Sequence, residues 1–124
     1  MKKYYLFLDD VRYPTDVKWV DLPLHAWTIV RSYKEFRKAI HNYGIPEFVA
    51  YDHDLADTHY TAMNHGGVID YNNLTEKTGY DCAKFLCEEC RKMNVKHPPF
   101  AVHSMNFVGR QNIERYIASY NKSV

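Results

Sequence analysis

The sequence lacks several features that would indicate common classes of protein. No apolar run approaches the ~18 residues of a membrane-spanning helix, and residues 4–8 are too short for the apolar part of a signal peptide. Neither sign of charge is in excess, since sixteen Lys and Arg stand against fifteen Asp and Glu. The net charge of +1 argues against a basic protein for long duplex nucleic acid and against an acidic disordered tail. We therefore expect no membrane and no long duplex among its partners.

Cysteines and well-known nucleotide motifs are also scarce. The chain has three cysteines, an odd number that suggests no disulfide framework and fits a reducing, cytoplasmic compartment. Cys87 and Cys90 form a C-x-x-C, but they fall on the expected apolar face of a helix without a second pair, which favours core packing over zinc binding. The chain contains no Walker motif, no G-x-G-x-x-G and no G-x-S-x-G.

Aromatic residues, in contrast, are plentiful. Eleven Tyr, six Phe and two Trp make 15% of the 124 residues, a content that excludes disorder. The length suits a single domain over residues 1–124. Some of these rings could line a pocket for a base or a sugar, although a packed core is the simpler explanation.

Three short apolar runs each end in polar residues. They cover residues 4–8, 48–51 and 100–102, and a fourth candidate at 27–30 lacks an acidic end. Each run is continuous rather than alternating, which is typical of strands buried on both faces of a parallel sheet. The sequence therefore predicts about four strands.

Helical patterns separate these runs. Ser32 and Glu35 form a capping box in front of an apolar stripe. A second helix is expected from Thr78, with Asp81 at its third position, and this start could bind an anion, although a cap explains it as well. A third helix is expected from about Gly109 to Tyr120. The alternation of strands and helices predicts an α/β domain with a mainly parallel sheet.

Two segments interrupt the alternation. Residues 11–26 contain two prolines and no helical period, so the first crossover helix should be missing or degenerate. Residues 55–77 have no clear helical period, and a loop of this length is usually functional or conceals a hairpin. Gly66-Gly67 followed by Val68-Ile69 is compatible with a small hairpin.

Chemistry is expected where the strands end, because ligands of open α/β sheets bind outside the carboxyl ends of the strands. The polar residues that follow the three runs at this edge are Asp9, Asp10, Arg12, Asp52, His53, Asp54, His103, Ser104, Asn106 and Arg110. Two carboxylates ~5 Å apart repel by ~3 kcal/mol at an effective dielectric constant of 20. Several such pairs require protonation, a cationic side chain or a metal ion.

The candidate ligands of a divalent metal ion are the four carboxylates Asp9, Asp10, Asp52 and Asp54. Oxygen-rich sites suit Mg²⁺ or Mn²⁺, and a neighbouring imidazole shifts the preference towards Mn²⁺. The alternative is that some of these acids cap helices or pair with Arg12 and Arg110.

Two histidines directly follow apolar runs and should emerge at this edge, namely His53 and His103. A pair of imidazoles can divide general-base and general-acid work at a phosphoester, or each can simply hydrogen-bond a backbone group. Three further histidines have the setting of surface or loop residues, namely His25, His41 and His97. Two others could reach the site if the long loop folded over it as a lid, namely His59 and His65.

Four motifs occur in a fixed order: Leu8-Asp9-Asp10-Val11-Arg12, Asp52-His53-Asp54-Leu55, Thr78-Gly79-Tyr80-Asp81, and His103-Ser104-Met105-Asn106 with Gly109-Arg110. Together they resemble the phage and bacterial family described as cyclic-phosphate-processing receiver-like domains, over residues 4–115. The resemblance implies a receiver-like, flavodoxin-type sheet. It also implies the handling of cyclic phosphates at RNA ends or in nucleotide signals, in RNA repair or phage–host conflict. The implied location is the cytoplasm of a bacterium or of a phage-infected cell.

A response-regulator receiver offers a useful contrast. Asp9-Asp10 looks like its acidic metal pair, Asp52 like its phosphoacceptor and Ser104 like its hydroxyl after the fourth strand. The chain ends after one more helix, so the fifth strand and its lysine are missing, and histidines stand at the strand ends. These departures argue against an aspartyl-phosphate switch and favour hydrolysis of a phosphoester.

The leading hypothesis is a metal-dependent phosphoesterase that acts on the cyclic phosphate of a small nucleotide or an RNA end. The expected catalytic residues are His53, His103 and Asp52. The expected substrate-binding residues, whose arginines would clamp phosphoryl oxygens, are Arg12, Ser104, Asn106 and Arg110. The alternatives are a nucleotide-binding module without catalysis, a receiver-like regulatory domain phosphorylated on Asp52, and a Toprim-like nuclease. The last normally has Glu where this chain has Asp9-Asp10. No pattern predicts the oligomeric state.

Overall fold

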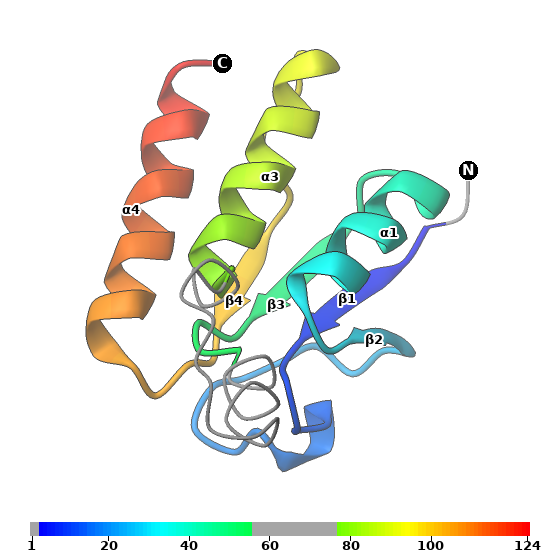
Figure 1. Cartoon of the computed structure of the whole chain (residues 1–124), viewed down its shortest axis with the longest axis vertical. Helices are drawn as coiled ribbons and strands as arrows, with labels where there is room; N and C mark the ends of the chain where they lie inside the picture. The colour runs from blue at the N-terminus through cyan, green and yellow to red at the C-terminus, as the bar shows by residue number, and fades with distance from the viewer. Residues whose placement is uncertain (1–2, 56–76) are drawn as a thin grey trace, which may run out of the picture.

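The computed structural model describes residues 3–55 and 77–124, in which strands and helices alternate (Figure 1). The strands are β1 (Tyr5–Leu8), β2 (Trp27–Val30), β3 (Phe48–Tyr51) and β4 (Phe100–Val102). The helices are the short 3₁₀ helix η1 (Pro14–Asp16) and the α-helices α1 (Tyr33–Tyr43), α3 (Gly79–Lys92) and α4 (Phe107–Lys122). The sheet order is β2-β1-β3-β4 and every pair is parallel. The predicted receiver-like α/β fold with a four-stranded parallel sheet is confirmed.

The helices begin where the sequence supplies a cap. Ser32 Oγ accepts the backbone N–H of Glu35 at the start of α1. Asp81 Oδ2 accepts the backbone N–H of Thr78 at 2.7 Å, so Thr78 is the cap of α3 and the helix starts where the sequence predicts. Helix α4 begins at Phe107, two residues before the predicted start, because the side chain of Asn106 accepts the N–H of Gly109 and serves as the cap.

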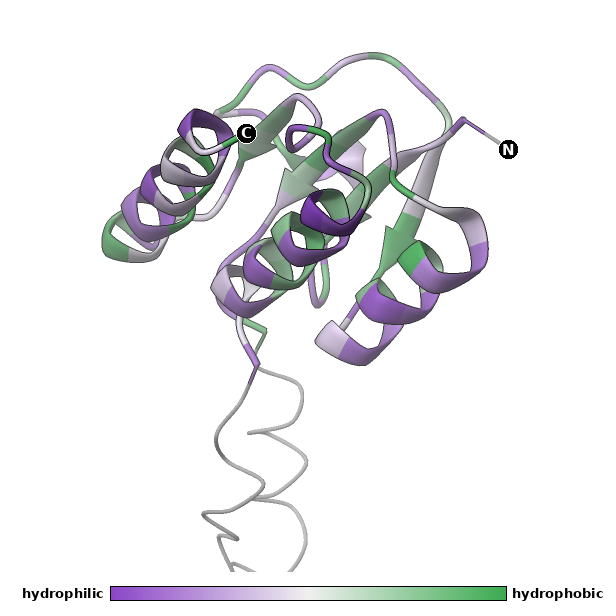
Figure 2. Cartoon of the chain, turned by 90° about the horizontal axis from the view of Figure 1, so that it is seen from above, coloured by the Kyte–Doolittle hydropathy of each residue, from purple (hydrophilic) through white to green (hydrophobic). Residues whose placement is uncertain are grey.

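The three α-helices cover one face of the sheet, with their apolar sides turned towards it (Figure 2). Alternate strand residues point to this face, among them Leu6, Leu8, Val49 and Tyr51, and all four are buried. The three cysteines of α3 are buried in the same core. Burial raises the pKa of Cys87 to about 12, as expected for a thiol that packs rather than reacts.

An irregular segment covers the opposite face of the sheet. The first crossover helix would lie there, and the sequence predicts that this helix is missing or degenerate. Between β1 and β2 the described chain forms only η1 and otherwise lacks regular structure. Val17, Val20 and Leu22 from this segment pack against Phe7 and Ala50 of the sheet. The prediction that the first crossover helix is degenerate is therefore confirmed, and apolar side chains of the connection do the packing instead.

The histidines outside the strand ends differ from one another. His25 and His41 are exposed, as predicted. His97 lies in the loop between α3 and β4, as predicted, but its side chain is buried and not at the surface. Its Nε2 lies 2.7 Å from Tyr51 Oη and its Nδ1 lies 2.6 Å from the carbonyl oxygen of Pro98. These two contacts satisfy the ring inside the core, and neither partner is apparent from local sequence.

Three sequence expectations lie outside the described residues, namely the hairpin at Gly66-Gly67 and the positions of His59 and His65. Among the described helices, none combines the length and the apolar character needed to cross a bilayer.

Candidate functional site

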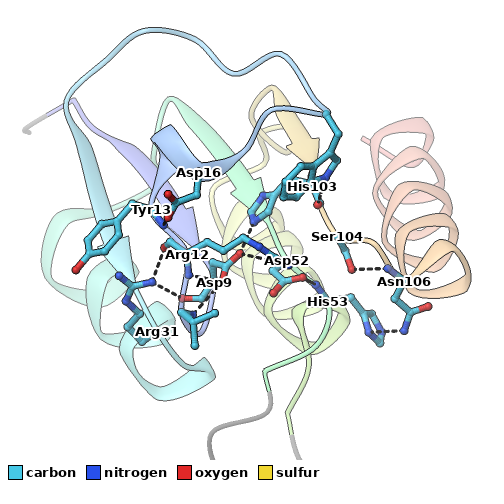
Figure 3. A network of polar contacts seen from close by, with 12 residues as sticks. Asp9, Arg12, Tyr13, Asp16, Arg31, Asp52, His53, His103, Ser104 and Asn106 are labelled. Atoms are coloured by element: carbon cyan, nitrogen blue, oxygen red, sulfur yellow. Dashed lines mark hydrogen bonds and ion pairs between the residues drawn. The ribbon is translucent and has the colours of Figure 1, made fainter.

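The backbone ladder continues one residue beyond β1, β3 and β4. The N–H of Asp9 donates to Val30 O at 3.2 Å, that of Asp52 to Leu8 O at 2.9 Å, and that of His103 to Tyr51 O at 2.9 Å. The three side chains therefore leave the same edge of the sheet from backbone that is held by the sheet (Figure 3). This is the convergence that a parallel sheet predicts.

Asp9, Asp52 and His103 form an inner cluster. One potential ligand atom from each residue lies within 4.8 Å of the other two, and all three residues are buried. His103 Nε2 lies 3.0 Å from Asp9 Oδ2, and its ring stacks on Phe7 with centroids 4.8 Å apart. The contact with Asp9 and the stacking on Phe7 thus fix the position of the His103 ring beside the carboxylates.

The carboxylate of Asp9 is strongly held by its surroundings. Its Oδ1 accepts the backbone N–H groups of Val11 and Arg12 at 3.0 and 2.8 Å, and Nη1 of Arg12 lies 3.6 Å from Oδ2. Burial alone would raise the pKa of Asp9, but the hydrogen bonds from His103 and from the two backbone groups hold it well below its usual range. Asp9 is charged, and its contact with Arg12 is the pairing that the alternative to metal binding named.

Asp52 has the opposite electrostatic setting. Burial and the neighbouring charge of Asp9 raise the pKa of Asp52 to about 6, with a smaller contribution from Asp10. The hydrogen bond that Asp52 Oδ1 accepts from the backbone N–H of His53 at 2.8 Å offsets only part of this. A cation placed between Asp9 and Asp52 would relieve the repulsion.

His53, Asp54 and Asn106 form an outer cluster. The Oδ1 of Asp54 lies 2.8 Å from His53 Nδ1 and 3.1 Å from Asn106 Nδ2. The amide orientation is fixed because Asn106 Oδ1 accepts the N–H of Gly109. Both Nδ1–H and the amide therefore donate to one carboxylate oxygen, which leaves Nε2 of His53 as the ring nitrogen that can exchange a proton. These hydrogen bonds outweigh burial and lower the pKa of Asp54.

Two glycines allow the helices to approach these residues. A Cβ at Gly109 would lie 2.3 Å from Cγ of His53, and a Cβ at Gly79 would lie 1.8 Å from the backbone oxygen of Asp52. The N–H of Gly79 also donates to His53 O at 2.8 Å. Both glycines stand in the motifs quoted above, and that was the available signal, although no role was predicted for either.

Other predicted site residues have different partners. Ser104 is buried and its Oγ accepts the N–H of Asn106 at 3.1 Å, so it supports the outer cluster. Arg110 Nε lies 3.5 Å from Glu114 Oε2, one turn along α4. Asp10 and Asp54 are not part of the three-residue group of potential metal ligands within the described chain. The charge of Asp10 nevertheless acts on Asp52.

Two contributors to the site were missed by sequence reasoning. Trp19 donates its Nε1–H to the carbonyl oxygen of His103 at 2.7 Å, and the guanidinium of Arg12 lies 5.2 Å from its ring centroid. Arg31 donates from Nη1 to the carbonyl oxygens of Asp9 and Arg12, which holds the turn after β1. Neither residue belongs to a local motif, since their partners are distant in sequence.

The inner cluster has the chemistry of a metal site. It offers two carboxylates and an imidazole, a donor set that suits Mn²⁺ and can also hold Mg²⁺. Nδ1 of His103 is buried and has no hydrogen-bond partner in the described part of the chain. A buried donor set with excess negative charge and an unsatisfied ring nitrogen fits a bound cation.

Comparison with protein families gives a match over residues 4–119 to the family described as the cyclic-phosphate processing receiver domain. Comparisons with curated proteins and with solved structures gave no match. The matched segment contains both clusters and all four strands. The chain therefore belongs to the family of cyclic-phosphate processing receiver domains.

Proposed function

We propose that this protein is a metal-dependent phosphoesterase that opens the cyclic phosphate of a nucleotide or of an RNA end. The observation that carries the proposal is the pairing of the two clusters: a buried acidic group able to hold a cation stands beside a histidine whose Nδ1 is fixed by a carboxylate. The family description names cyclic phosphates. The setting predicted from the sequence, RNA repair or phage–host conflict in bacterial cytoplasm, is part of the proposal.

The reaction is a hydrolysis that balances without a further reactant. The oxygen of water forms a bond to phosphorus, one P–O bond of the ring breaks, and the departing oxygen takes up a proton. The product is a phosphomonoester next to a free hydroxyl. Asp9, Asp52 and His103 would hold the divalent metal, which when bound supplies charge stabilisation at the phosphoryl oxygens.

His53 is suited to move the protons of this step. With Nδ1–H donating to Asp54, Nε2 can take a proton from water and then return it to the departing oxygen. The sequence assigns the base and acid roles to His53 and His103 together. The complete burial of His103 and its contact with Asp9 favour a different division, in which His103 positions Asp9 and the metal while His53 transfers protons.

The predicted substrate-binding residues differ in whether they can contact a phosphate without first losing another partner. Arg12 already extends over the inner cluster and can contact a non-bridging oxygen. Arg110 would first have to leave Glu114, but such a half-exposed pair contributes only ~0–1 kcal/mol and is easily exchanged for a phosphate. Asn106 and Ser104 act through the position of His53 and through the cap of α4.

Hydrolysis assays test the proposal. The wild-type protein should open 2′,3′-cyclic nucleotides, 2′,3′-cyclic RNA ends or cyclic oligonucleotides in the presence of Mn²⁺ or Mg²⁺, with product identified by ³¹P NMR, and EDTA should stop the reaction. His53→Asn should lower kcat by about 10²–10⁴, the usual contribution of general acid–base catalysis. His41→Ala, at an exposed histidine of α1, is the matched control. No turnover of any of these substrates, or equal rates for His53→Asn and the wild type, would contradict the proposal.

The second candidate is a receiver-like regulatory role. Asp52 stands at the end of β3 beside Asp9, and Ser104 places a buried hydroxyl after β4, as a phosphoacceptor site requires. Incubation with acetyl phosphate should then label the protein, and Asp52→Asn should abolish the label. Labelling in a protein that opens no cyclic phosphate would favour this candidate.

A further inference from the structure

Exposed apolar side chains gather in the two connections that flank the inner cluster. Val11 and Trp19 follow β1, Met105 follows β4, and Phe107 and Val108 are the first two residues of α4. Trp19 is 41% exposed and Phe107 is 69% exposed. Apolar groups exposed around a polar site are typical of a surface that is covered when a ligand binds.

Trp19 is the member of this group whose position is set by the site itself. Its Nε1–H is held by the carbonyl oxygen of His103, and the guanidinium of Arg12 lies against its ring. Arg12 also pairs with Asp9 across the inner cluster (Figure 3). An indole that is fixed at one edge and one face, yet remains exposed, is preorganised, so a ligand that stacks on it need not order it first.

The second tryptophan has a different setting. Trp27 lies on β2 and makes edge-to-face contacts with the rings of Tyr5, Phe7 and Phe48. Sheet packing explains Trp27, because its neighbours are rings of β1 and β3. Packing does not explain why Trp19 is exposed next to His103.

The chemistry of the ligand follows from what stands next to Trp19. The cation-binding cluster and Arg12 suit a phosphate, and the adjoining indole suits a planar ring. A nucleoside that carries a cyclic phosphate has both groups, whereas a phosphorylated sugar or glycerol has nothing planar to place there. Building on the proposed function, we propose that the nucleobase of the substrate stacks on Trp19, so that the protein recognises the base as well as the phosphate.

A pair of substrates tests whether Trp19 is a platform on which the nucleobase stacks. Glycerol 1,2-cyclic phosphate has the same five-membered phosphate ring as a nucleoside 2′,3′-cyclic phosphate but carries no base. Trp19→Ala should raise KM for the nucleoside substrate roughly 5- to 150-fold, the range expected for one stacked base, and should leave the glycerol substrate unaffected. Trp19→Phe should restore most of the affinity. An equal loss on both substrates would overturn the proposal, because it would mean that Trp19 only supports His103.

Two further arms complete the kinetic test. Leu24→Ala, at an exposed apolar residue of the same connection, is the control and should change neither substrate. A short RNA that ends in a 2′,3′-cyclic phosphate should show the same dependence on Trp19 as the mononucleotide, which would assign the stacked base to the terminal nucleoside. No dependence on Trp19 with either the RNA or the mononucleotide would overturn the platform.

Fluorescence separates this proposal from the proposed hydrolysis. Trp27→Phe leaves Trp19 as the only tryptophan of the chain, because the sequence has two. Titration with a nucleoside 3′-monophosphate should quench its emission, and inorganic phosphate at the same concentration should not. Equal quenching by the two probes, or none by the nucleotide, would overturn the platform. Quenching by the nucleotide in a protein without turnover would contradict the hydrolysis alone.

Discussion

Two imidazoles are buried at opposite ends of β4, and they differ in what their ring nitrogens contact. Before the strand, one ring nitrogen of His97 contacts the hydroxyl of Tyr51 and the other contacts a backbone carbonyl oxygen. After the strand, His103 has a carboxylate at Nε2 and, within the described chain, no partner at Nδ1. Both rings are therefore buried, but within the described chain His97 has a partner at each nitrogen, a closed set of contacts, and His103 has a partner at only one, an open set. The closed set stabilises the fold, and the open set can accept a ligand.

The electrostatic surroundings of the two rings widen this difference. Burial lowers the pKa of His97 to about 4, and the hydrogen bond to Pro98 offsets only part of the effect. Around His103 the chain instead gathers Asp9, Asp52 and the guanidinium of Arg12. Two carboxylates placed together out of water repel each other and destabilise the fold, and this arrangement supports the proposed binding of a cation.

The largest expected effect comes from removing one charge of the inner cluster. Asp52→Asn should lower activity about a thousandfold, because metal binding supplies several kcal/mol of transition-state stabilisation. In EDTA at pH 8 the same change should raise the free energy of unfolding by about 1–3 kcal/mol, since it removes a buried charge next to Asp9. Urea unfolding and the hydrolysis assay measure the two effects. The exposed Asp21→Asn is the control, and a variant less stable than the wild type in EDTA would contradict the prediction.

The next largest effect is the loss of stability at acid pH that we expect from the buried ring of His97. Above pH 6.5 His97 is neutral in both states, and between pH 6.5 and 4 only the unfolded chain takes up its proton. The free energy of unfolding should therefore fall as pH falls through this window, by up to about 3 kcal/mol. Urea unfolding across the window should give a flatter profile for His97→Phe than for the wild type.

The contribution of His97 is the difference between the pH profiles of the wild type and of His97→Phe. Asp52, whose folded pKa is raised to about 6, gains its proton earlier in the folded state and changes stability in the opposite direction as pH falls. This contribution is common to both proteins and cancels in the difference. His41→Ala should keep the wild-type profile, and parallel profiles for His97→Phe and the wild type would show that another group causes the acid sensitivity.

The meeting of Asp9, Asp52 and His103 was predictable, because parallel strands that end at one edge bring the following residues together whatever their side chains. Side-chain direction was not predictable in the same way. Asp54 was expected among the metal ligands with Asp52, and its Oδ1 lies 2.8 Å from His53 Nδ1 in the outer cluster, a contact that no local pattern predicts. Arg110 pairs with a carboxylate on its own helix. A local pattern in sequence gives the edge of a site better than it gives the partners within it.

The fold shows the same limit. Prolines and a missing helical period in residues 11–26 correctly predict an irregular connection, because both features act locally. The path of this connection, which brings Trp19 to the carbonyl of His103, depends on packing across the sheet and has no local signal. The burial of His97 depends in the same way on Tyr51, which lies 46 residues away in the chain.

The smallest expected effect separates the position of His53 from its chemistry. Gly109→Ala places a Cβ 2.3 Å from the ring of His53, so the ring must move and its contact with Asp54 lengthens. We expect kcat to fall roughly 10- to 100-fold, as for a displaced general base. Stability should change by less than about 1 kcal/mol, because the strain is offset by the better helix propensity of alanine. Ser119→Ala, at an exposed position of α4, is the matched control.

A double variant decides whether Gly109 acts through His53. If the Cβ at position 109 harms catalysis only by moving that ring, Gly109→Ala should lower kcat in the wild type and change nothing further in His53→Asn. Additive losses would instead mean that the Cβ disturbs α4 or Asn106 independently of the histidine. If Gly109→Ala changes nothing further in His53→Asn, the comparison extends to the outer cluster, because a ring whose position depends on the absence of a Cβ at Gly109 is held for chemistry and not for packing.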